Sequence, residues 1–370
     1  MIKNKIVLED MQYIYTNLSQ AEKNKFKKSK ILITGCAGFL GYYLMNFFLN
    51  KKEELGIESV TGLDNFKLGK APWVYDMSNE NKDIKIYDFD ITKDNIEITG
   101  DDCQYDFIIH MASIASPVFY RKYPIETLDA NVWGLRRLLD FYKDKEIKGF
   151  LFFSSSEVYG DPLPSFIPTP EEYKGNVSML GPRACYDEAK RFGETICYLY
   201  AKQYNLPITI ARPFNNYGPG MRLNDKRVPA DFAKAVSENK DIVMFSDGKP
   251  TRTFCYIADA IMGYLKVLTH GNFDYFNIGV DTPEISIKEL AEIYRKKSKE
   301  IFGHSINIKF EVASDKEYLI NNPSRRCPVI DKARKLLDYN PSIYVEEGVE
   351  RFLQFIKFNK EESSSGERYL

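Results

Sequence analysis

Short apolar runs alternate with longer amphipathic stretches through much of this chain. Runs typical of buried strands occur at residues 31–34, 59–63, 84–87, 107–111, 149–153 and 208–211. Stretches with helical spacing of apolar residues lie between them, notably at 42–49, 124–143 and 186–204. This alternation predicts an α/β fold of Rossmann type, with a doubly wound and mainly parallel sheet. Ligands of such sheets bind beyond the carboxyl ends of the strands.

The same pattern divides the chain into unequal parts. Residues 1–29 carry one apolar helical face, which predicts an N-terminal helical arm that docks on the domain or on a partner subunit. Residues 30–214 form the predicted Rossmann domain, and a later segment near 250–280 returns to it. Residues 215–360 have shorter, mixed elements and predict a smaller, interleaved α/β domain that binds substrate. Residues 361–370 have the composition of a flexible tail.

Three glycines follow the first predicted strand and lead into a helix. Gly35, Gly38 and Gly41 are spaced three residues apart. Glycines at such a turn let the backbone approach a diphosphate, and the N-terminus of the helix offers free N–H groups to it. The sequence therefore predicts a dinucleotide site after the first strand.

Asp64 ends the second predicted strand, where a carboxylate can accept hydrogen bonds from an adenosine ribose. A carboxylate there repels a 2′-phosphate, which favours NAD over NADP. Lys67 and Lys70 follow closely and would weaken that preference if they faced the ribose.

Tyr186 and Lys190 are four residues apart in a predicted helix and so share one face. An ammonium beside a phenol favours the phenolate and lowers its pKa from about 10. Tyr186 is therefore a candidate base for the proton of a hydroxyl group. Alone, this spacing more often marks an exposed polar pair, so the interpretation depends on the motifs around it.

Composition excludes several other classes of function. The 51 basic and 52 acidic side chains leave a net charge of -1, which gives no global field to recruit nucleic acid or a membrane surface. The six cysteines have no short repeating spacing, which argues against a metal site or a disulfide framework. Because no apolar run reaches the length of a membrane span, and the start at residues 1–5 lacks the apolar core of a signal peptide, we expect a cytoplasmic protein.

Taken together, the motifs resemble the extended short-chain dehydrogenase/reductase family, in its nucleotide-sugar branch. The resemblance covers roughly residues 30–355 and is carried by Gly35/Gly38/Gly41, Asp64, the Ser-Ser-Ser-Glu-Val-Tyr-Gly run at 154–160, Tyr186/Lys190, the Arg-Pro-Phe-Asn run at 212–215 and Thr-Arg-Thr-Phe at 251–254. It implies a tightly held NAD, a Ser-Tyr-Lys catalytic group and a nucleoside-diphosphate sugar bound by the C-terminal part. It also implies a homodimer built from the helices at 124–143 and 186–204.

Within this branch the chain is most similar to the UDP-glucuronate decarboxylases. The similarity rests on residues 111–117, 181–191 and 224–228. Nucleotide-sugar 4,6-dehydratases typically have Thr-Asp-Glu before the residue that matches Val158, with the Asp as the acid that expels water. This chain has Ser155, Ser156 and Glu157, which is similar to the Thr-Ser-Glu of the decarboxylases. It departs from their pattern at Ser155, where Thr is usual, and at Val329, where Asp is common.

The resemblance assigns roles to matching positions. The implied catalytic residues are Tyr186, Lys190, Ser155, Ser156, Glu157 and Arg252. The implied cofactor-binding residues are Gly35, Gly38, Phe39, Leu40, Gly41, Asp64, Asn65, Asp90, Ile91, Met111, Ala112, Ser113, Asn131, Tyr186 and Lys190. The implied substrate-binding residues are Ser116, Arg183, Asn215, Arg227, Val228, Phe245, Arg252 and Arg325. Structural alternatives stay open at Glu157 as an ordinary anion, Arg183 as a loop anchor, and Val228 and Phe245 as core.

On a sugar with a C5 carboxylate, the implied reaction begins when Tyr186 takes the C4 hydroxyl proton while a hydride passes to NAD. The resulting β-keto acid loses carbon dioxide, Ser155 and Tyr186 donate to the C4 oxygen, and Ser156 or Glu157 supplies a proton to C5. Arg252 would contact either the carboxylate or the diphosphate. A 4-epimerase, a 4,6-dehydratase or a 4-oxidase on the same scaffold stays an alternative, and so does a non-catalytic NAD-binding interaction protein.

Overall fold

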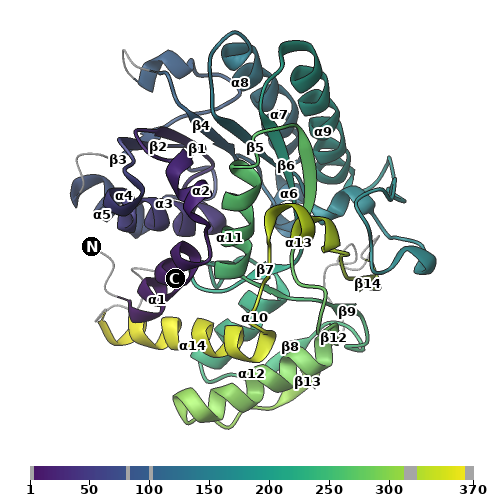
Figure 1. Ribbon diagram of the computed structural model, residues 1–370. Coiled ribbons are helices and arrows are strands. Elements are labelled where there is room, and N and C mark those ends of the chain that lie inside the picture. Colours follow the sequence, from purple (N-terminus) through teal and green to yellow (C-terminus); the bar gives the residue numbers. More distant parts are fainter. Residues whose placement is uncertain (1–3, 81–83, 100–102, 312–322, 363–370) are drawn as a thin grey trace.

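A seven-stranded, wholly parallel sheet forms the centre of the molecule (Figure 1). The computed structural model describes residues 4–80, 84–99, 103–311 and 323–362. The strands lie in the order β3-β2-β1-β4-β5-β6-β11. They are β1 Lys30–Thr34, β2 Ser59–Asp64, β3 Ile84–Asp88, β4 Phe107–His110, β5 Gly149–Phe153, β6 Ile208–Pro213 and β11 Asp274–Ile278. The predicted Rossmann-type α/β fold is confirmed.

Helices cover both faces of this sheet, which is why its strands are almost continuously apolar. Successive side chains of a strand point to opposite faces. Ile31 and Ile33 pack in the layer of α3 and α11, whereas Leu32 packs in the layer of α8 and α9. The helices of the two layers are α3 Phe39–Asn50 and α11 Ile257–Leu268 on one face, and α7 Pro124–Asp129, α8 Leu135–Tyr142 and α9 Ala184–Tyr204 on the other.

The stretch predicted as one helix at 124–143 is helical but not uniform. A π-helical turn, η2 Ala130–Gly134, separates α7 from α8. Such turns often occur at functional sites because they redirect side chains within a helix. The shorter elements between residues 50 and 170 are α4 Lys52–Leu55, α5 Pro72–Glu80, η1 Ile96–Thr99, α6 Pro117–Lys122, η3 Ser156–Tyr159 and η4 Pro164–Phe166.

A smaller mixed lobe lies beyond the carboxyl ends of the central strands (Figure 1). Three small sheets pair β10 with β7, β12 with β9 and β14, and β13 with β8. Its elements are β7 Asn216–Tyr217, α10 Val228–Ser237, β8 Ile242–Met244, β9 Thr251–Arg252, β10 Cys255–Tyr256, β12 Ile285–Ser286, α12 Ile287–Phe302, β13 Ile308–Phe310, β14 Arg325–Arg326, α13 Asp331–Leu337 and α14 Val345–Glu362. The predicted tail at 361–370 falls largely outside the described residues, from 363 onward.

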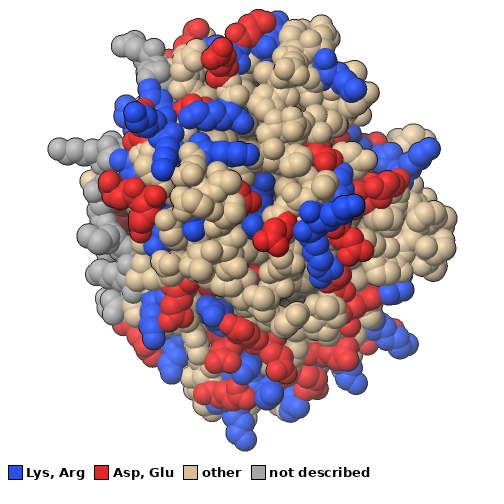
Figure 2. Space-filling view, in the orientation of Figure 1, with Lys and Arg blue, Asp and Glu red and all other residues tan. Residues whose placement is uncertain are grey.

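Charges of both signs interleave on the face of the molecule that Figure 2 shows, and the net charge of the chain is only -1. Such a surface offers no broad field of one sign to a polyanion. Within the described ranges, no helix combines the length and the apolar character that crossing a bilayer demands.

The N-terminal arm consists of α1 Lys5–Thr16 and α2 Gln20–Lys25. The apolar face of the arm, with Val7, Met11, Ile14 and Leu18, is buried in the core formed with α3 and α11. Of the two expected docking partners, the arm therefore contacts its own domain.

Asp10 anchors this arm by a buried polar contact. The carboxylate is fully buried, and its Oδ2 accepts hydrogen bonds from the hydroxyls of Tyr43 at 2.7 Å and Tyr256 at 2.6 Å. Arg351 Nη1 lies 3.0 Å from Oδ1. Burial raises the pKa of Asp10 to about 6, although hydrogen bonds from both tyrosines oppose this shift. One carboxyl group thus joins α1 to α3, β10 and α14.

We predict that Asp10→Ala lowers the free energy of unfolding by about 2–4 kcal/mol, because two buried hydroxyls and a guanidinium lose their acceptor. Urea unfolding followed by circular dichroism measures this difference. Glu9→Ala is the matched control, since the Glu9 side chain is 46% exposed and its removal should cost less than about 0.5 kcal/mol. Equal stability of the two variants would contradict the anchoring role of Asp10.

Candidate functional site

A cavity of about 670 Å³ opens at the carboxyl ends of the central strands and extends into the small lobe. This volume is typical of sites for cofactors and small molecules. The cavity is lined by nearly every residue predicted from the sequence: Gly35, Gly38, Phe39, Leu40, Gly41, Asp64, Asn65, Asp90, Ile91, Met111, Ala112, Ser113, Ser116, Ser155, Ser156, Glu157, Arg183, Tyr186, Lys190, Asn215, Arg227, Val228, Phe245 and Arg252. Asn131 and Arg325 are not among the lining residues.

The glycine turn fits a diphosphate. Gly35 has a φ of +73°, and a Cβ there would lie 2.7 Å from the amide nitrogen of Ala112. A Cβ on Gly41 would lie 2.0 Å from the carbonyl oxygen of Cys36. Gly38 is different, because it precedes α3 without a side-chain cap and its Cβ would meet only the Gly35 oxygen at 3.4 Å. Gly35 and Gly41 are thus needed by the fold, whereas Gly38 keeps space open before the helix N-terminus.

Backbone hydrogen bonds hold Asp64 against this turn. Its Oδ2 accepts from the Ala37 amide at 2.9 Å, and its Oδ1 accepts from the Phe66 amide at 2.8 Å. Burial raises the pKa of Asp64 above its ordinary value. The two lysines considered from the sequence are engaged elsewhere: Lys67 Nζ lies 3.1 Å from the Glu126 carboxylate, and Lys70 Nζ lies over the Phe66 ring. This geometry fits a ribose without a 2′-phosphate.

Asn131 acts from behind the cavity wall. It lies in the π-helical turn η2, and its Nδ2 donates to Ser113 Oγ at 2.9 Å and to the Thr127 carbonyl at 2.7 Å. Ser113 in turn lines the cavity after β4. The sequence predicted Asn131 as a cofactor contact, but in the structure Ser113 lies between Asn131 and the cavity.

Tyr186 and Lys190 lie at the start of α9 and face the cavity as predicted. Lys190 Nζ donates to the Phe153 carbonyl at 2.6 Å and lies 5.6 Å from the centre of the Tyr186 ring. The sequence predicted that Lys190 lowers the pKa of the Tyr186 phenol, and this direction is wrong. Burial raises the pKa of Tyr186 to about 12, partly offset by a hydrogen bond from Ser155, and burial lowers the pKa of Lys190 to about 7.

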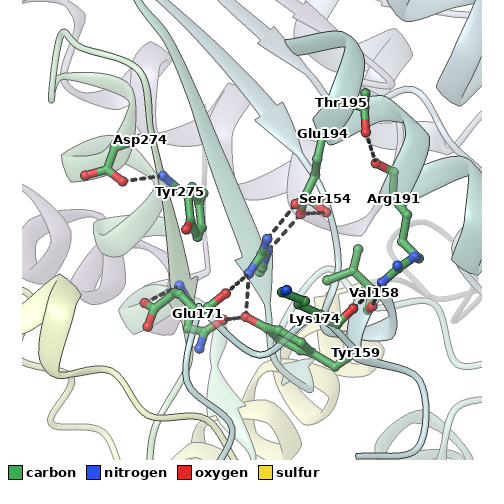
Figure 3. A network of polar contacts seen from close by, with 12 residues as sticks. Ser154, Val158, Tyr159, Glu171, Lys174, Arg191, Glu194, Thr195, Asp274 and Tyr275 are labelled. Carbon is green, nitrogen blue, oxygen red and sulfur yellow. Dashed lines mark hydrogen bonds and ion pairs between the residues drawn. The ribbon is translucent and has the colours of Figure 1, made fainter. Parts of the chain in front are cut away.

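A buried network fixes the end of β5 and the middle of α9 behind this pair (Figure 3). Arg212 Nε and Nη2 donate to the two carboxylate oxygens of Glu194 at 2.8 and 2.6 Å. Ser154 Oγ donates to Glu194 at 2.5 Å, and Arg212 Nη1 donates to the Tyr159 hydroxyl at 2.7 Å. Because Ser154 precedes Ser155 and Glu194 follows Lys190 by one turn, this network holds in register the two segments that carry the predicted catalytic residues.

Glu157 lies between two guanidinium groups. It forms a short ion pair with Arg183 Nη2, and Arg326 Nη1 lies 2.9 Å from Glu157 Oε1. Arg326 Nη1 also donates to Ser156 Oγ at 3.0 Å. Burial alone would raise the pKa of Glu157, but Arg326 and Arg183 hold it below its ordinary value. The carboxylate is therefore ionised at neutral pH.

Arg252 is a buried cation that, unlike Arg183 and Arg326, forms no ion pair with a described carboxylate. Within the described part of the chain, its guanidinium donates to backbone carbonyls, those of Thr251 at 2.8 Å, Ser324 at 3.2 Å and Pro323 at 2.5 Å. Burial, together with the nearby Arg326, lowers the pKa of Arg252 to about 10. A buried cation without a carboxylate partner, lining a cavity, is suited to bind an anionic ligand group.

The remaining substrate candidates line the part of the cavity near the small lobe. Arg227 forms a forked pair with Asp225, at 2.5 Å from Nε and 2.9 Å from Nη2. Ser116 Oγ donates to the Asp225 carbonyl at 2.6 Å, and Asn215 Nδ2 donates to the Thr253 carbonyl at 2.9 Å. These contacts orient the side chains before any ligand is present.

The sequence predicted Arg325 as a substrate contact, but its neighbour Arg326 is the one that lines the cavity. Arg325 pairs with Glu284 through Nε at 2.9 Å and Nη2 at 2.6 Å, on an exposed edge of β14. Arg326, which is buried, lines the cavity. Successive side chains of a strand point to opposite sides, so only one of the two arginines can enter.

Two further residues were missed. The ring of Tyr120 stacks on that of Tyr186, with ring centres 5.2 Å apart and planes inclined by 10°. Asp187 lies behind Arg183, whose Nε is 3.4 Å from Asp187 Oδ2. Position beside the predicted base was the available signal for Asp187, whereas no local pattern marked Tyr120.

We predict that Gly38→Ala weakens NAD binding by about tenfold or more, because its methyl group enters the space before α3. The same change should leave the unfolding midpoint close to that of the wild type, since the nearest atom would be 3.4 Å away. Calorimetric titration with NAD and thermal unfolding measure the two effects. Unchanged NAD affinity in a folded variant would contradict the assignment of this turn.

Comparisons with known proteins agree with this site. The NAD dependent epimerase/dehydratase family matches residues 31–279. The chain is 35% identical to UDP-glucuronic acid decarboxylase 1 of Arabidopsis thaliana over 88% of its length and 69% of the relative. It is 34% identical to UDP-glucuronic acid decarboxylase 1 of Xenopus tropicalis over 93% of its length and 75% of the relative.

Among solved structures, UDP-glucuronic acid 4-epimerase from Bacillus cereus, in complex with UDP-glucuronic acid and NAD, superposes with a TM-score of 0.71 at 26% identity. The match covers 89% of this chain and 99% of that one. The family match, the glycine turn and the aspartate after β2 agree on the cofactor, which is NAD. The chain belongs to the NAD dependent epimerase/dehydratase family.

Proposed function

We propose that this protein is a decarboxylase that converts UDP-glucuronate to UDP-xylose and uses NAD without net consumption. The observation that carries the proposal is the buried group of Glu157, Arg183, Arg326 and Arg252 beside Tyr186. It supplies a cation, Arg252, that lacks a carboxylate partner among the described residues, which suits the carboxylate of an acidic sugar. The similarity to UDP-glucuronic acid decarboxylases supports the same substrate.

In this reaction Tyr186 takes the proton of the C4 hydroxyl and later returns it. NAD, when bound, accepts the hydride from C4 and gives it back at the end of the turnover. Ser155 hydrogen-bonds the phenol and favours its ionised form. Lys190, fixed by the Phe153 carbonyl, lies near the phenol and is positively charged below about pH 7, where its lowered pKa lies. Because burial alone favours the neutral phenol, these donors have to oppose the cost of ionising it.

Loss of carbon dioxide leaves an electron pair that delocalises into the C4 ketone. Ser155 and Tyr186 donate to the oxygen where this charge develops. The sequence offered Ser156 or Glu157 as the source of the C5 proton. The ionised state of Glu157 favours Ser156, whose oxygen accepts from Arg326 and whose own proton is therefore free to point into the cavity.

The same geometry disfavours a 4,6-dehydratase, which needs a protonated acid to expel water. At the position of that acid the chain has Ser156. A 4-epimerase acting on the same acidic sugar is the second candidate, because the solved UDP-glucuronic acid 4-epimerase has a similar fold at 26% identity. The two reactions share the ketone and differ in its fate.

The test is to incubate the protein with UDP-glucuronate and catalytic NAD, and to follow carbon dioxide and the anomeric proton of the sugar by NMR. We expect one carbon dioxide and one UDP-pentose per sugar consumed. UDP-galacturonate without carbon dioxide would establish the epimerase instead, and a 4-keto sugar formed in an amount equal to NADH, with the reaction stopping when the NAD is consumed, would indicate an oxidase.

Tyr186→Phe should reduce the rate of this reaction about 10²- to 10⁴-fold, because the general base is removed. Tyr204→Phe, at the end of the same helix, is the matched control and should retain the wild-type rate. A fully active Tyr186→Phe variant would contradict the role of Tyr186 as the base, whereas a wild-type protein that binds NAD but turns over no nucleotide sugar would favour the non-catalytic alternative.

The homodimer is also a proposal, supported by an apolar surface on α7, η2 and α9. Its large exposed side chains are Ile125, Leu128, Trp133, Phe192 and Leu199. Trp133 is 56% exposed and Phe192 is 53% exposed, which is unusual for neighbouring aromatic residues on one helical layer. A second copy that presents the same helices would bury this surface as an isologous contact.

We predict that Trp133→Glu shifts the protein from dimer to monomer, because a carboxylate would be buried in that contact. Sedimentation velocity at micromolar concentration measures the change. Exposed Tyr75, on α5 and 53% exposed, provides the control as Tyr75→Glu, which should leave the assembly intact. A wild-type monomer, or a dimer that survives Trp133→Glu, would refute this interface.

A cytoplasmic location is proposed from the thiols. None of the six cysteines, all within the described ranges, forms a disulfide. Free and mostly buried thiols are typical of a reducing compartment.

A further inference from the structure

Asp187 directly follows the catalytic tyrosine, yet the reaction outlined above does not use it. Its side chain is 7% exposed, and one of its oxygens, Oδ1, is buried without a hydrogen-bond partner among the described residues. Its other oxygen, Oδ2, lies 3.4 Å from Arg183 Nε. A buried carboxyl oxygen without a donor is costly when ionised, so its position beside the active centre calls for a reason.

Arg183 lies between two carboxyl groups. Its Nη2 pairs with Glu157, and its Nε faces Asp187. Arg326 reaches Glu157 from the other side, at 2.9 Å, but forms no such contact with Asp187. Glu157 therefore has two cationic partners, Arg183 and Arg326. Among the described residues, Asp187 has only a longer contact to Arg183, which it shares with Glu157.

These unequal surroundings shift the pKa values of the two acids in opposite directions. The charged or titratable groups around Asp187 are Glu157 on η3, Arg326 on β14, Tyr120 on α6, and Arg183, Cys185 and Tyr186 at the start of α9. Burial and the Glu157 charge raise the pKa of Asp187 to about 7, while the pKa of Glu157 is lowered. Paired acids whose environments separate their pKa values commonly have distinct roles in a reaction.

We propose that Asp187 is a positioning residue that sets the charge of the substrate carboxylate site through Arg183. This inference rests on the proposed function, since it concerns binding of an acidic sugar. When Asp187 is protonated, Arg183, Arg252 and Arg326 face a single carboxylate, Glu157, within the cluster. When Asp187 ionises, it neutralises part of the Arg183 charge and adds a second anion near the place of the substrate carboxylate.

The sign of the pH dependence follows from this arrangement. Because the pKa of Asp187 is raised, the carboxyl is neutral in mildly acidic solution and ionises as the pH rises through about 7. Affinity for UDP-glucuronate should therefore fall with rising pH, whereas affinity for UDP-glucose, which lacks the C5 carboxylate, should change much less. Lys190 titrates in the same pH range, and because it is unchanged in Asp187→Asn, the comparison of that variant with the wild type isolates the contribution of Asp187.

The test compares the affinities for UDP-glucuronate and UDP-glucose by calorimetry between about pH 6 and about pH 8.5. In the wild-type holoenzyme we expect the ratio to shift roughly tenfold against UDP-glucuronate over this range. Asp187→Asn, which keeps the shape and stays neutral, should remove this shift and retain the affinity found in acidic solution. The control Glu188→Gln changes an exposed neighbour and should behave as the wild type.

A purely structural role for Asp187 predicts a loss of affinity at every pH, and a shift that survives Asp187→Asn would overturn the proposal. A second readout needs no substrate. In protein labelled with ¹³C at the aspartate carboxyls, the signal that disappears in Asp187→Asn should titrate near neutral pH.

A signal that titrates near the ordinary value, about 4, would also overturn the proposal. If the protein releases no carbon dioxide from UDP-glucuronate, the proposed function fails while this titration still decides the state of Asp187.

Discussion

Charges that are buried at the carboxyl edge of the sheet need partners, and this constraint organises the site. Glu157 is a partly buried carboxylate that two guanidinium groups compensate, so it stays ionised. Arg252 is a buried guanidinium whose hydrogen-bond partners among the described residues are backbone carbonyls. The protein thus satisfies its own anion and leaves a cation for the ligand. In the proposed function, the carboxylate of the acidic sugar completes this balance.

The two lobes supply opposite halves of this arrangement. The Rossmann part presents Tyr186, Lys190 and Glu157 from α9 and the end of β5. The small lobe brings Arg252 on β9 and Arg326 on β14, which are adjacent in one small sheet. The chemistry therefore depends on the fit between lobes. The N-terminal arm contributes to that fit from a distance, because Asp10 ties α1 to α3 and to α14.

Much of the fold and the cofactor site could be predicted from the sequence, because periodicity and glycine spacing are local signals. The strands, the glycine turn and Asp64 followed from them. The choice between Arg325 and Arg326 did not, since it depends on which side of β14 faces the cavity. The pKa of Tyr186 was predicted in the wrong direction, because helix spacing reveals a nearby lysine but not the burial of both groups. Tyr120 meets Tyr186 only through the tertiary fold.

The reaction of UDP-glucuronate in D₂O, with the product analysed by NMR, distinguishes decarboxylation with internal hydride return from the other reactions of the ketone. We expect UDP-xylose with one deuterium at C5, since that proton comes from the solvent, and with the original hydrogen retained at C4, since the hydride returns within the same turnover. A product that keeps its carboxylate and contains no deuterium would contradict decarboxylation. Solvent deuterium at C4 would contradict the internal return of the hydride.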